Sequence, residues 1–193
     1  MTPARLAKLT KVLNQRQFDL TVVLENVLDP HNISAVLRTA EVVGVQHIYV
    51  LNTRIEAHKR FGVKSSSSAV KWVTVHQYDI TKNCFDALRQ QGFAIYTTHI
   101  GDDSVCLYSM DLTQRVALVF GNEHTGVSEE ALAQADGNFL LPQAGIIQSL
   151  NISVACAVAL YEAKRQKLLA GHYNSPTRDA EARQALALAW KTR

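Results

Sequence analysis

Short apolar runs alternate with longer helical patterns along most of this chain. Strands are expected at six runs: LTVVLE (20–25), HIYVL (47–51), WVTV (72–75), FAIYTT (93–98), VALVF (116–120) and FLL (139–141). Helices are expected at 3–15, 32–43, 81–91, just after Ser128, at 151–169 and at 179–190. A chain in which helices connect successive strands forms a parallel sheet covered on both faces. The alternation therefore predicts an α/β fold with a parallel sheet flanked by helices.

Residues with a strong capping preference predict where three helices begin. Asn32 is expected to begin the helix at 32–43, and Ser128 to begin a short one. Ser149 or Asn151 is expected to begin the long helix near the end of the chain.

The length of 193 residues accommodates one hydrophobic core. Apolar residues make up 47% of the chain and charged residues 19%, which is typical of a globular protein and excludes a disordered one. We expect one central domain at 19–171, with short helical extensions at 1–18 and 172–193.

Several classes of protein are excluded by what the sequence lacks. No apolar run approaches the ~20 residues that a membrane helix needs, and the first residues do not form a signal peptide. The three cysteines are odd in number and far apart, which argues against disulfides and predicts a cytoplasmic protein. The sequence has no dinucleotide fingerprint, P-loop, G-x-S-x-G elbow or zinc-spaced histidine pair. We therefore expect no metal site, and neither nucleotide hydrolysis nor a common hydrolase activity.

The net charge of +3 permits binding to a polyanion without requiring it. Basic side chains gather in two places: Arg54, His58, Lys59, Arg60 and Lys64, and then Lys164, Arg165 and Lys167. A solvated charged surface explains both clusters equally well.

Two polar loops follow predicted strands: GNEHTG at 121–126 and PQAGIIQSLN at 142–151. Parallel sheets bind ligands at the carboxyl ends of their strands, so both loops are candidates for a site. Each residue also has a structural explanation, since glycines serve turns and Arg38 could pair with Glu41 one helical turn on. Taken one at a time, these residues indicate only an α/β domain whose ligand is unknown.

Three separated segments together resemble the motifs of one enzyme family. NISAVLRTA (32–40), LVFGNEHTGVS (118–128) and LPQAGIIQSLNISVACAVALYE (141–162) are similar to the three motifs of the SpoU, or TrmH-like, RNA ribose methyltransferases. The resemblance covers roughly residues 1–170. The opening segment, about residues 4–45, is most similar to the members of this family that act on a tRNA guanosine.

The resemblance implies a sheet whose C-terminal half is tied in a deep trefoil knot, which periodicity does not show. It also implies a homodimer that binds S-adenosylmethionine in the knotted loops at 97–101, 120–123 and 141–150. The cofactor-binding residues that it implies are Thr98, Gly121, Leu141, Ile146, Ile147 and Leu150.

By motif position, the implied catalytic residues are Arg38, Asn32, Glu123, Ser149 and Asn151. A guanidinium has too high a pKa to act readily as a base. We therefore expect Arg38 to hold a substrate phosphate and stabilise the developing alkoxide, while a phosphate oxygen or Asn32 receives or steers the proton. Glu123 and Asn151 are expected to orient Arg38 and the ribose, with Ser149 completing the hydrogen bonds. No metal is needed, because the donor already carries a good leaving group.

The implied substrate is tRNA, methylated on the 2′-hydroxyl of the D-loop guanosine at position eighteen. The residues expected to contact its phosphates are Arg5, Lys8, Lys11, Arg16, Arg54, Lys59, Arg60 and Lys64. Three alternatives stay open: another tRNA position or an rRNA as substrate, a catalytically silent RNA-binding module on this fold, and a protein that binds another adenosine ligand.

Overall fold

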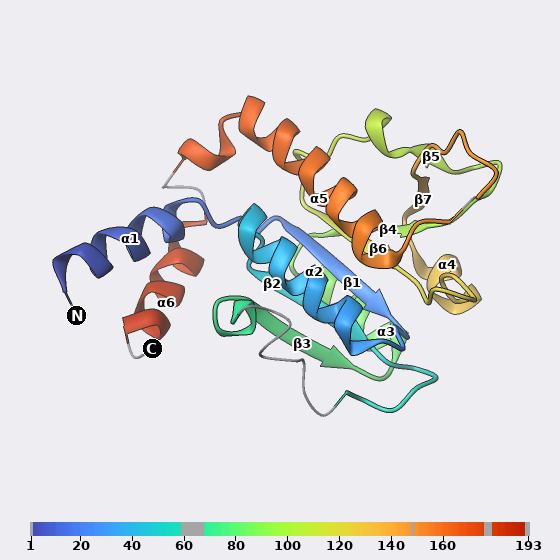
Figure 1. Cartoon of the computed structure of the whole chain (residues 1–193), viewed down its shortest axis with the longest axis horizontal. Coiled ribbons are helices and arrows are strands. Elements are labelled where there is room, and N and C mark those ends of the chain that lie inside the picture. Colours follow the sequence, from blue (N-terminus) through green and yellow to red (C-terminus); the bar gives the residue numbers. More distant parts are fainter. Residues whose placement is uncertain (1, 59–67, 148, 176–178, 192–193) are drawn as a thin grey trace.

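The computed structural model describes residues 2–58, 68–147, 149–175 and 179–191 (Figure 1). The described strands are β1 (Leu20–Glu25), β2 (His47–Leu51), β3 (Thr74–Tyr78), β4 (Ala94–Thr98), β5 (Val105–Cys106), β6 (Val116–Phe120) and β7 (Gly137–Leu140). All pair in parallel, in the order β3-β2-β1-β6-β4-β7-β5. The predicted α/β fold with a parallel sheet is confirmed.

The described α-helices are α1 (Pro3–Asn14), α2 (Pro30–Val43), α3 (Thr81–Gln90), α4 (Glu129–Gln134), α5 (Ile152–Leu169) and α6 (Ala180–Lys191). Short 3₁₀ turns occur at η1 (Ala69–Lys71), η2 (Leu107–Ser109) and η3 (His172–Asn174). In Figure 1, α2 and α5 lie over the same face of the sheet. Helices α1 and α6 lie side by side, beyond one end of the strands.

The side chains of the central strands alternate between two hydrophobic cores, one on each face of the sheet. Val22 of β1 packs in the core that contains the apolar side of α2 and α5. Its neighbour Val23 packs in the second core, with Phe85 of α3 and Ala131 of α4. Strands β1 and β6 are buried along their whole length, as expected for inner parallel strands.

At the level of single elements, the start of one predicted strand was wrong and one strand was not predicted. The strand expected at 72–75 begins at Thr74, because Trp72 ends the turn η1. The two-residue strand β5 has no sequence signal, because it is very short and lies at the edge of the sheet, where it pairs with β7 among the described strands.

The start of α2 also differs from the prediction, and the difference matters for function. Asp29 is the N-cap, with its side chain accepting the amide N–H of His31 at 2.8 Å, and Pro30 is the first helical residue. Asn32 therefore lies inside the first turn, where its side chain is not used as a cap. The predicted caps Ser128 and Asn151 are confirmed, because each accepts a backbone N–H of its helix.

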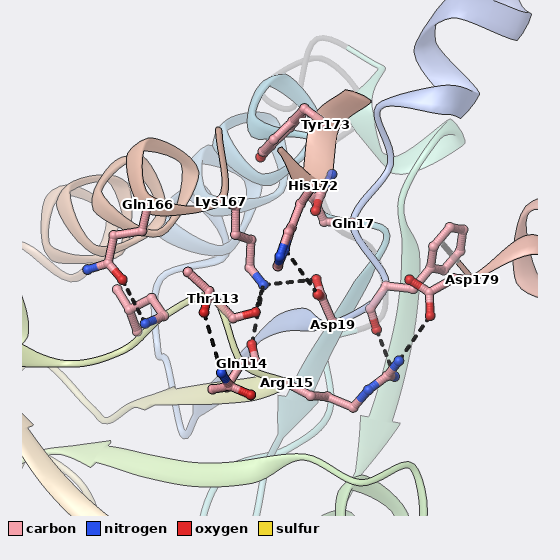
Figure 2. Close-up of polar contacts among 12 residues, drawn as sticks. Gln17, Asp19, Thr113, Gln114, Arg115, Gln166, Lys167, His172, Tyr173 and Asp179 are labelled. Atoms are coloured by element: carbon pink, nitrogen blue, oxygen red, sulfur yellow. Dashed lines mark hydrogen bonds and ion pairs between the residues drawn. The ribbon is translucent and has the colours of Figure 1, made fainter. Parts of the chain in front are cut away.

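Charged residues are buried where the amino ends of the strands meet the end of α5 (Figure 2). Lys167 and Asp19 are fully buried, and Nζ of Lys167 lies 3.0 Å from a carboxylate oxygen of Asp19. The ammonium group also donates to the carbonyls of Thr113 and Gln114 at 3.1 and 3.2 Å. Lys167, which belongs to a basic cluster in the sequence, thus fastens α5 to the sheet and is not part of a solvated surface.

Candidate functional site

A cavity of about 500 Å³ lies at the carboxyl ends of β4, β6 and β7. Its walls come from the ends of these strands, from the loops that follow them and from the first turn of α5. Phe120, Phe139 and Leu141 give it apolar walls, and Thr98, Glu123 and Ser149 add polar groups. Size, shape and composition are those of a pocket for a small organic ligand.

A chain of hydrogen bonds joins the three motif segments beside this cavity. The side-chain amide of Asn32 donates to Oε1 of Glu123 at 2.7 Å, and that of Asn151 donates to the amide oxygen of Asn32 at 3.1 Å. These residues come from α2, from the loop after β6 and from the start of α5, so 91 and 119 positions separate the bonded pairs. Within the described residues, Oε2 of Glu123 is buried and has no hydrogen-bond partner. A buried carboxylate oxygen without a donor is costly, which suits a site that receives one from a ligand.

The loop 121–126 closes tightly on itself. A Cβ atom at Gly121 would lie 2.1 Å from the carbonyl carbon of Gly126, so only glycine fits there. Asn122 and Gly126 exchange backbone hydrogen bonds of 3.0 and 2.9 Å across the loop. Gly121 is thus required by the loop's own packing and, at the same time, lines the cavity.

The residue after β1 ties this loop to the segment that follows β2. Asn26 has a left-handed backbone with φ +51°, and its amide oxygen accepts the N–H groups of Thr53 and Arg54, both at 2.9 Å. Its own carbonyl accepts the side-chain amide of Asn122 at 2.8 Å. The sequence analysis did not single out Asn26 or Asn122. For Asn26, an Asn directly after a buried strand was the available signal, whereas Asn122 follows β6 by two residues.

The structure places four of the six predicted cofactor residues on the cavity wall: Thr98, Gly121, Leu141 and Leu150. Ile146 and Ile147 lie outside it and are exposed. His99 and Ile100 also line the cavity, because they directly follow β4 in the predicted cofactor loop 97–101.

Of the predicted catalytic residues, Arg38 is not brought to this cavity. Arg38 is exposed on α2 and lines a second cavity, with α1 and α6. Six residues on a helix correspond to about 240° of rotation, so Arg38 and Asn32 lie on different sides of α2. Glu41, its expected partner, instead binds Arg16 at 2.9 Å, so that pairing prediction was wrong.

The predicted RNA contacts divide into three groups. Arg5, Lys8, Lys11 and Arg54 are exposed. Arg16 is fully buried, bound by Glu41 and by the carbonyl of Val45, which contradicts a direct contact with RNA phosphates. Lys59, Arg60 and Lys64 lie outside the described residues.

Burial decides the chemistry of two cysteines. It raises the pKa of the Cys84 thiol to about 12 and raises that of Cys156 as well. Neither side chain is therefore a thiolate near neutral pH. Among the described residues, no group of three or more His, Cys, Asp or Glu side chains could hold a metal ion. No described helix has the length and apolar character required to cross a bilayer.

Comparison with known proteins connects this geometry with one family, since the model described as the SpoU rRNA Methylase family matches residues 19–161. The chain belongs to the SpoU family. The resemblance read from the three motifs is confirmed, and the match includes Asn32, Glu123 and Asn151.

Individual relatives cover most or nearly all of the chain. A Thermus thermophilus protein named tRNA (guanosine(18)-2'-O)-methyltransferase is 43% identical over 189 residues, which are 98% of this chain and 96% of that protein. The crystal structure of the TrmH/SpoU tRNA modifying enzyme of A. aeolicus matches with a TM-score of 0.88 and 35% identity, over 97% of this chain and 94% of that one. An AdoMet-bound rRNA methyltransferase of Sinorhizobium meliloti matches with a TM-score of 0.68 and 27% identity, over 79% of this chain and 59% of that one.

Proposed function

We propose that this SpoU family member transfers a methyl group from S-adenosylmethionine to the 2′-hydroxyl of guanosine 18 in tRNA. The observation that carries the proposal is the hydrogen-bonded chain of Asn32, Glu123 and Asn151 beside a cavity of about 500 Å³. The named activity of the Thermus thermophilus relative, similar over nearly its full length, supports the choice of substrate. A reaction on tRNA agrees with the predicted cytoplasmic location.

The cavity fits the cofactor in size and chemistry. Phe120, Leu141 and Leu150 form apolar walls for a flat base, while Thr98 and Ser149 offer polar groups. When bound, S-adenosylmethionine supplies an electrophilic methyl group on a positively charged sulfur. The residues of this chain have to align the ribose oxygen with that methyl group, and alignment alone can supply roughly 7 to 11 kcal/mol.

The polar residues beside the cavity provide this alignment. Glu123 accepts a hydrogen bond from a ribose hydroxyl through its buried Oε2, and Asn32 holds the carboxylate in place. Asn151 fixes Asn32 in turn, and Ser149 binds the sugar from the opposite loop. Arg38 binds the phosphate and stabilises the alkoxide, while a phosphate oxygen receives the proton. Asn32 does not take the proton, because its amide oxygen already accepts from Asn151 and its amide nitrogen donates to Glu123.

The separation of Arg38 from Glu123 in one chain supports a homodimer, in which the partner subunit's Arg38 completes each site. Ile146, Ile147, Leu150 and Val154 form an apolar group on the surface beside the cavity, each at least 44% exposed. Exposed apolar groups of this kind mark protein interfaces.

Mixing two variants, each impaired at a different residue of the site, tests this arrangement. Arg38→Ala and Glu123→Gln homodimers each lack one half of both sites. After subunit exchange, half of the dimers are mixed and carry one intact site, which restores about a quarter of wild-type activity. Absence of any recovery, with exchange verified by tagged subunits, contradicts a site shared between subunits.

Arg38→Lys tests the role of the guanidinium. A point charge replaces the planar, bidentate group poorly, so single-turnover methylation should slow by about 10-fold or more. A near-normal rate excludes the proposed stabilisation of the alkoxide by Arg38.

We also infer that the part of the chain from β4 to α5 forms the trefoil knot of this family. A knot survives when the chain is pulled by its ends. Force extension of the unfolded protein should therefore stop short of the roughly 650 Å expected for 193 extended residues. Extension to the full length contradicts the knot.

Incubation of the enzyme with labelled cofactor and a tRNA transcript tests the proposed function as a whole. We expect one labelled methyl group, in an alkali-resistant linkage at guanosine 18, and none when that nucleotide carries a 2′-deoxyribose. Labelling of rRNA fragments but not of tRNA supports the ribosomal alternative, and RNA binding without any transfer supports a silent binding module.

A further inference from the structure

A second cavity, of about 580 Å³, lies between α1, α2, η1 and α6. Helix α1 contributes Arg5 and Lys8, and α2 contributes Arg38. Trp72, at the end of η1, and Trp190, on α6, supply aromatic walls. The proposed cofactor site shares none of these residues.

The aromatic part of this cavity is held rigidly. The rings of Trp72 and Trp190 meet edge to face, with centroids 5.3 Å apart and an interplanar angle of 82°. The guanidinium of Arg16 lies over the Trp190 ring, 5.3 Å from its centroid, and forms a cation–π contact with it. Trp72 remains half-buried, so part of its ring is available to a ligand.

Trp190 also carries a hydrogen-bond donor that is not used. The residue is 3% exposed, and its indole Nε1 is buried without a hydrogen-bond partner in the described structure. A buried indole N–H usually has an acceptor, because leaving the donor unpaired costs about 1 to 3 kcal/mol. The missing acceptor points to a ligand that enters the cavity.

The charge around the cavity is positive. Arg5, Lys8 and Arg38 are exposed cations on its wall, and the one acidic lining residue, Glu41, is paired with Arg16. Aromatic faces combined with cations are the means by which proteins hold unpaired RNA bases together with their phosphates.

We infer that this cavity receives the base of the nucleotide that is methylated. The base stacks on Trp72 and accepts a hydrogen bond from Nε1 of Trp190, and guanine offers O6 and N7 as acceptors. Arg5 and Lys8 hold the flanking phosphates. Arg38 lines the same cavity, so the ribose of the bound nucleotide lies beside the arginine expected to act on it. This inference rests on the proposed function and adds a residue-level site for the base.

Intrinsic tryptophan fluorescence can report binding at this site. The two tryptophans of the chain are Trp72 and Trp190, and both line the cavity. A base that stacks there must quench the intrinsic tryptophan fluorescence, whereas S-adenosylhomocysteine in the other cavity should change it little.

The decisive experiment compares a tRNA transcript with guanosine at position eighteen and the same transcript with an abasic nucleotide there. We expect the guanosine transcript to quench the fluorescence and to bind about 10-fold more tightly than the abasic one, as stacking of one base provides. Equal affinity and equal quenching overturn the inference.

Variants of the two tryptophans identify the contact. Trp72→Leu should weaken binding of the guanosine transcript about 10-fold and leave the abasic transcript unaffected, while Trp72→Phe keeps most of the affinity. Trp190→Phe, which retains a ring but not the donor, should also affect only the guanosine transcript. Thermal unfolding of each variant verifies that it is folded, and equal losses with both transcripts overturn the inference.

Two lysines of α1 form a matched control. Lys8 lines the cavity, whereas Lys11 is exposed on the same helix but does not line it. Lys8→Ala should reduce the quenching and the affinity more than Lys11→Ala. Equal effects of the two substitutions indicate general attraction to RNA and overturn a specific site.

Two further outcomes are distinguishable from these. Loss of the dimer in the Trp72 variants shows that a second copy of the chain occupies the cavity, which overturns the inference. A wild-type protein that methylates no tRNA refutes the proposed function itself.

Discussion

The two ends of the parallel sheet use polar residues in opposite ways. At the amino ends of the strands, Lys167 and Asp19 are fully buried and paired at 3.0 Å (Figure 2). At the carboxyl ends, Asn32, Glu123 and Asn151 form an open chain, and one oxygen of Glu123 lacks a partner within the described residues.

The difference teaches where to look for chemistry in this fold. Charges whose partners lie inside the protein hold elements together, and charged or polar groups left without a protein partner are available to a ligand. If that distinction is correct, substitutions at the amino ends change stability, whereas substitutions at the carboxyl ends change activity.

The largest expected effect is on stability, from Lys167→Met. The change leaves the Asp19 carboxylate buried without its main counter-charge, so the free energy of unfolding should fall by about 3 to 5 kcal/mol. Urea unfolding followed by circular dichroism measures it. The double variant Lys167→Met with Asp19→Asn should recover part of the loss. A single-variant loss below about 1 kcal/mol means that the buried pair does not fasten α5.

The next effect concerns pH, at the amino end of β2. Burial, together with the charge of nearby His76, lowers the pKa of His47 to about 4 from an ordinary value of 6.5. Between pH 6.5 and pH 4, the imidazole of His47 is therefore protonated in the unfolded chain but mostly neutral in the folded chain. The resulting contribution to stability is complete above pH 6.5 and is lost as the pH falls toward 4, by about 3 kcal/mol.

His47→Gln measures this contribution by removing the titrating group. Unfolding experiments across pH 4 to 7 should show a smaller slope for the variant than for the wild type. An unchanged slope assigns the pH dependence to other groups.

At the carboxyl ends, Glu123→Gln should slow methyl transfer by about 10- to 100-fold and leave the melting temperature nearly unchanged. The amide keeps the shape of the side chain but removes the charge and replaces the open oxygen by a donor. Glu129→Gln, on the exposed face of α4, is the matched control and should have no effect. A large loss of stability in Glu123→Gln contradicts the expectation that substitutions at the carboxyl ends of the strands change activity and not stability.

The smallest effect is expected for an ion pair that belongs to neither end. Lys82 and Asp86 form an i, i+4 pair on α3, with side chains 69% and 43% exposed. Lys82→Ala should change the free energy of unfolding by less than about 0.5 kcal/mol, because water screens such pairs. If Lys82→Ala lowers the free energy of unfolding as much as Lys167→Met does, burial does not explain why the two ion pairs differ in their contribution to stability.

The sequence identified the strands and helices where the apolar pattern was strong. The continuous apolar run of β6 and the caps Ser128 and Asn151 are local signals, so they were readable without a structure. The strand β5 and the capping role of Asp29 were not, since one depends on a distant strand and the other on competition with Asn32.

For the site, the motifs named Glu123 and Asn151 but could not show which residues they contact. The identity of side chains in the three motifs, and hence the family, was determined by the sequence alone. The tertiary structure decided that Asn32 bonds to Glu123, that Arg16 and Lys167 are buried, and that Arg38 lies in a second cavity. The physical reason is that burial and pairing depend on residues far apart in the chain, which periodicity and local propensity do not record.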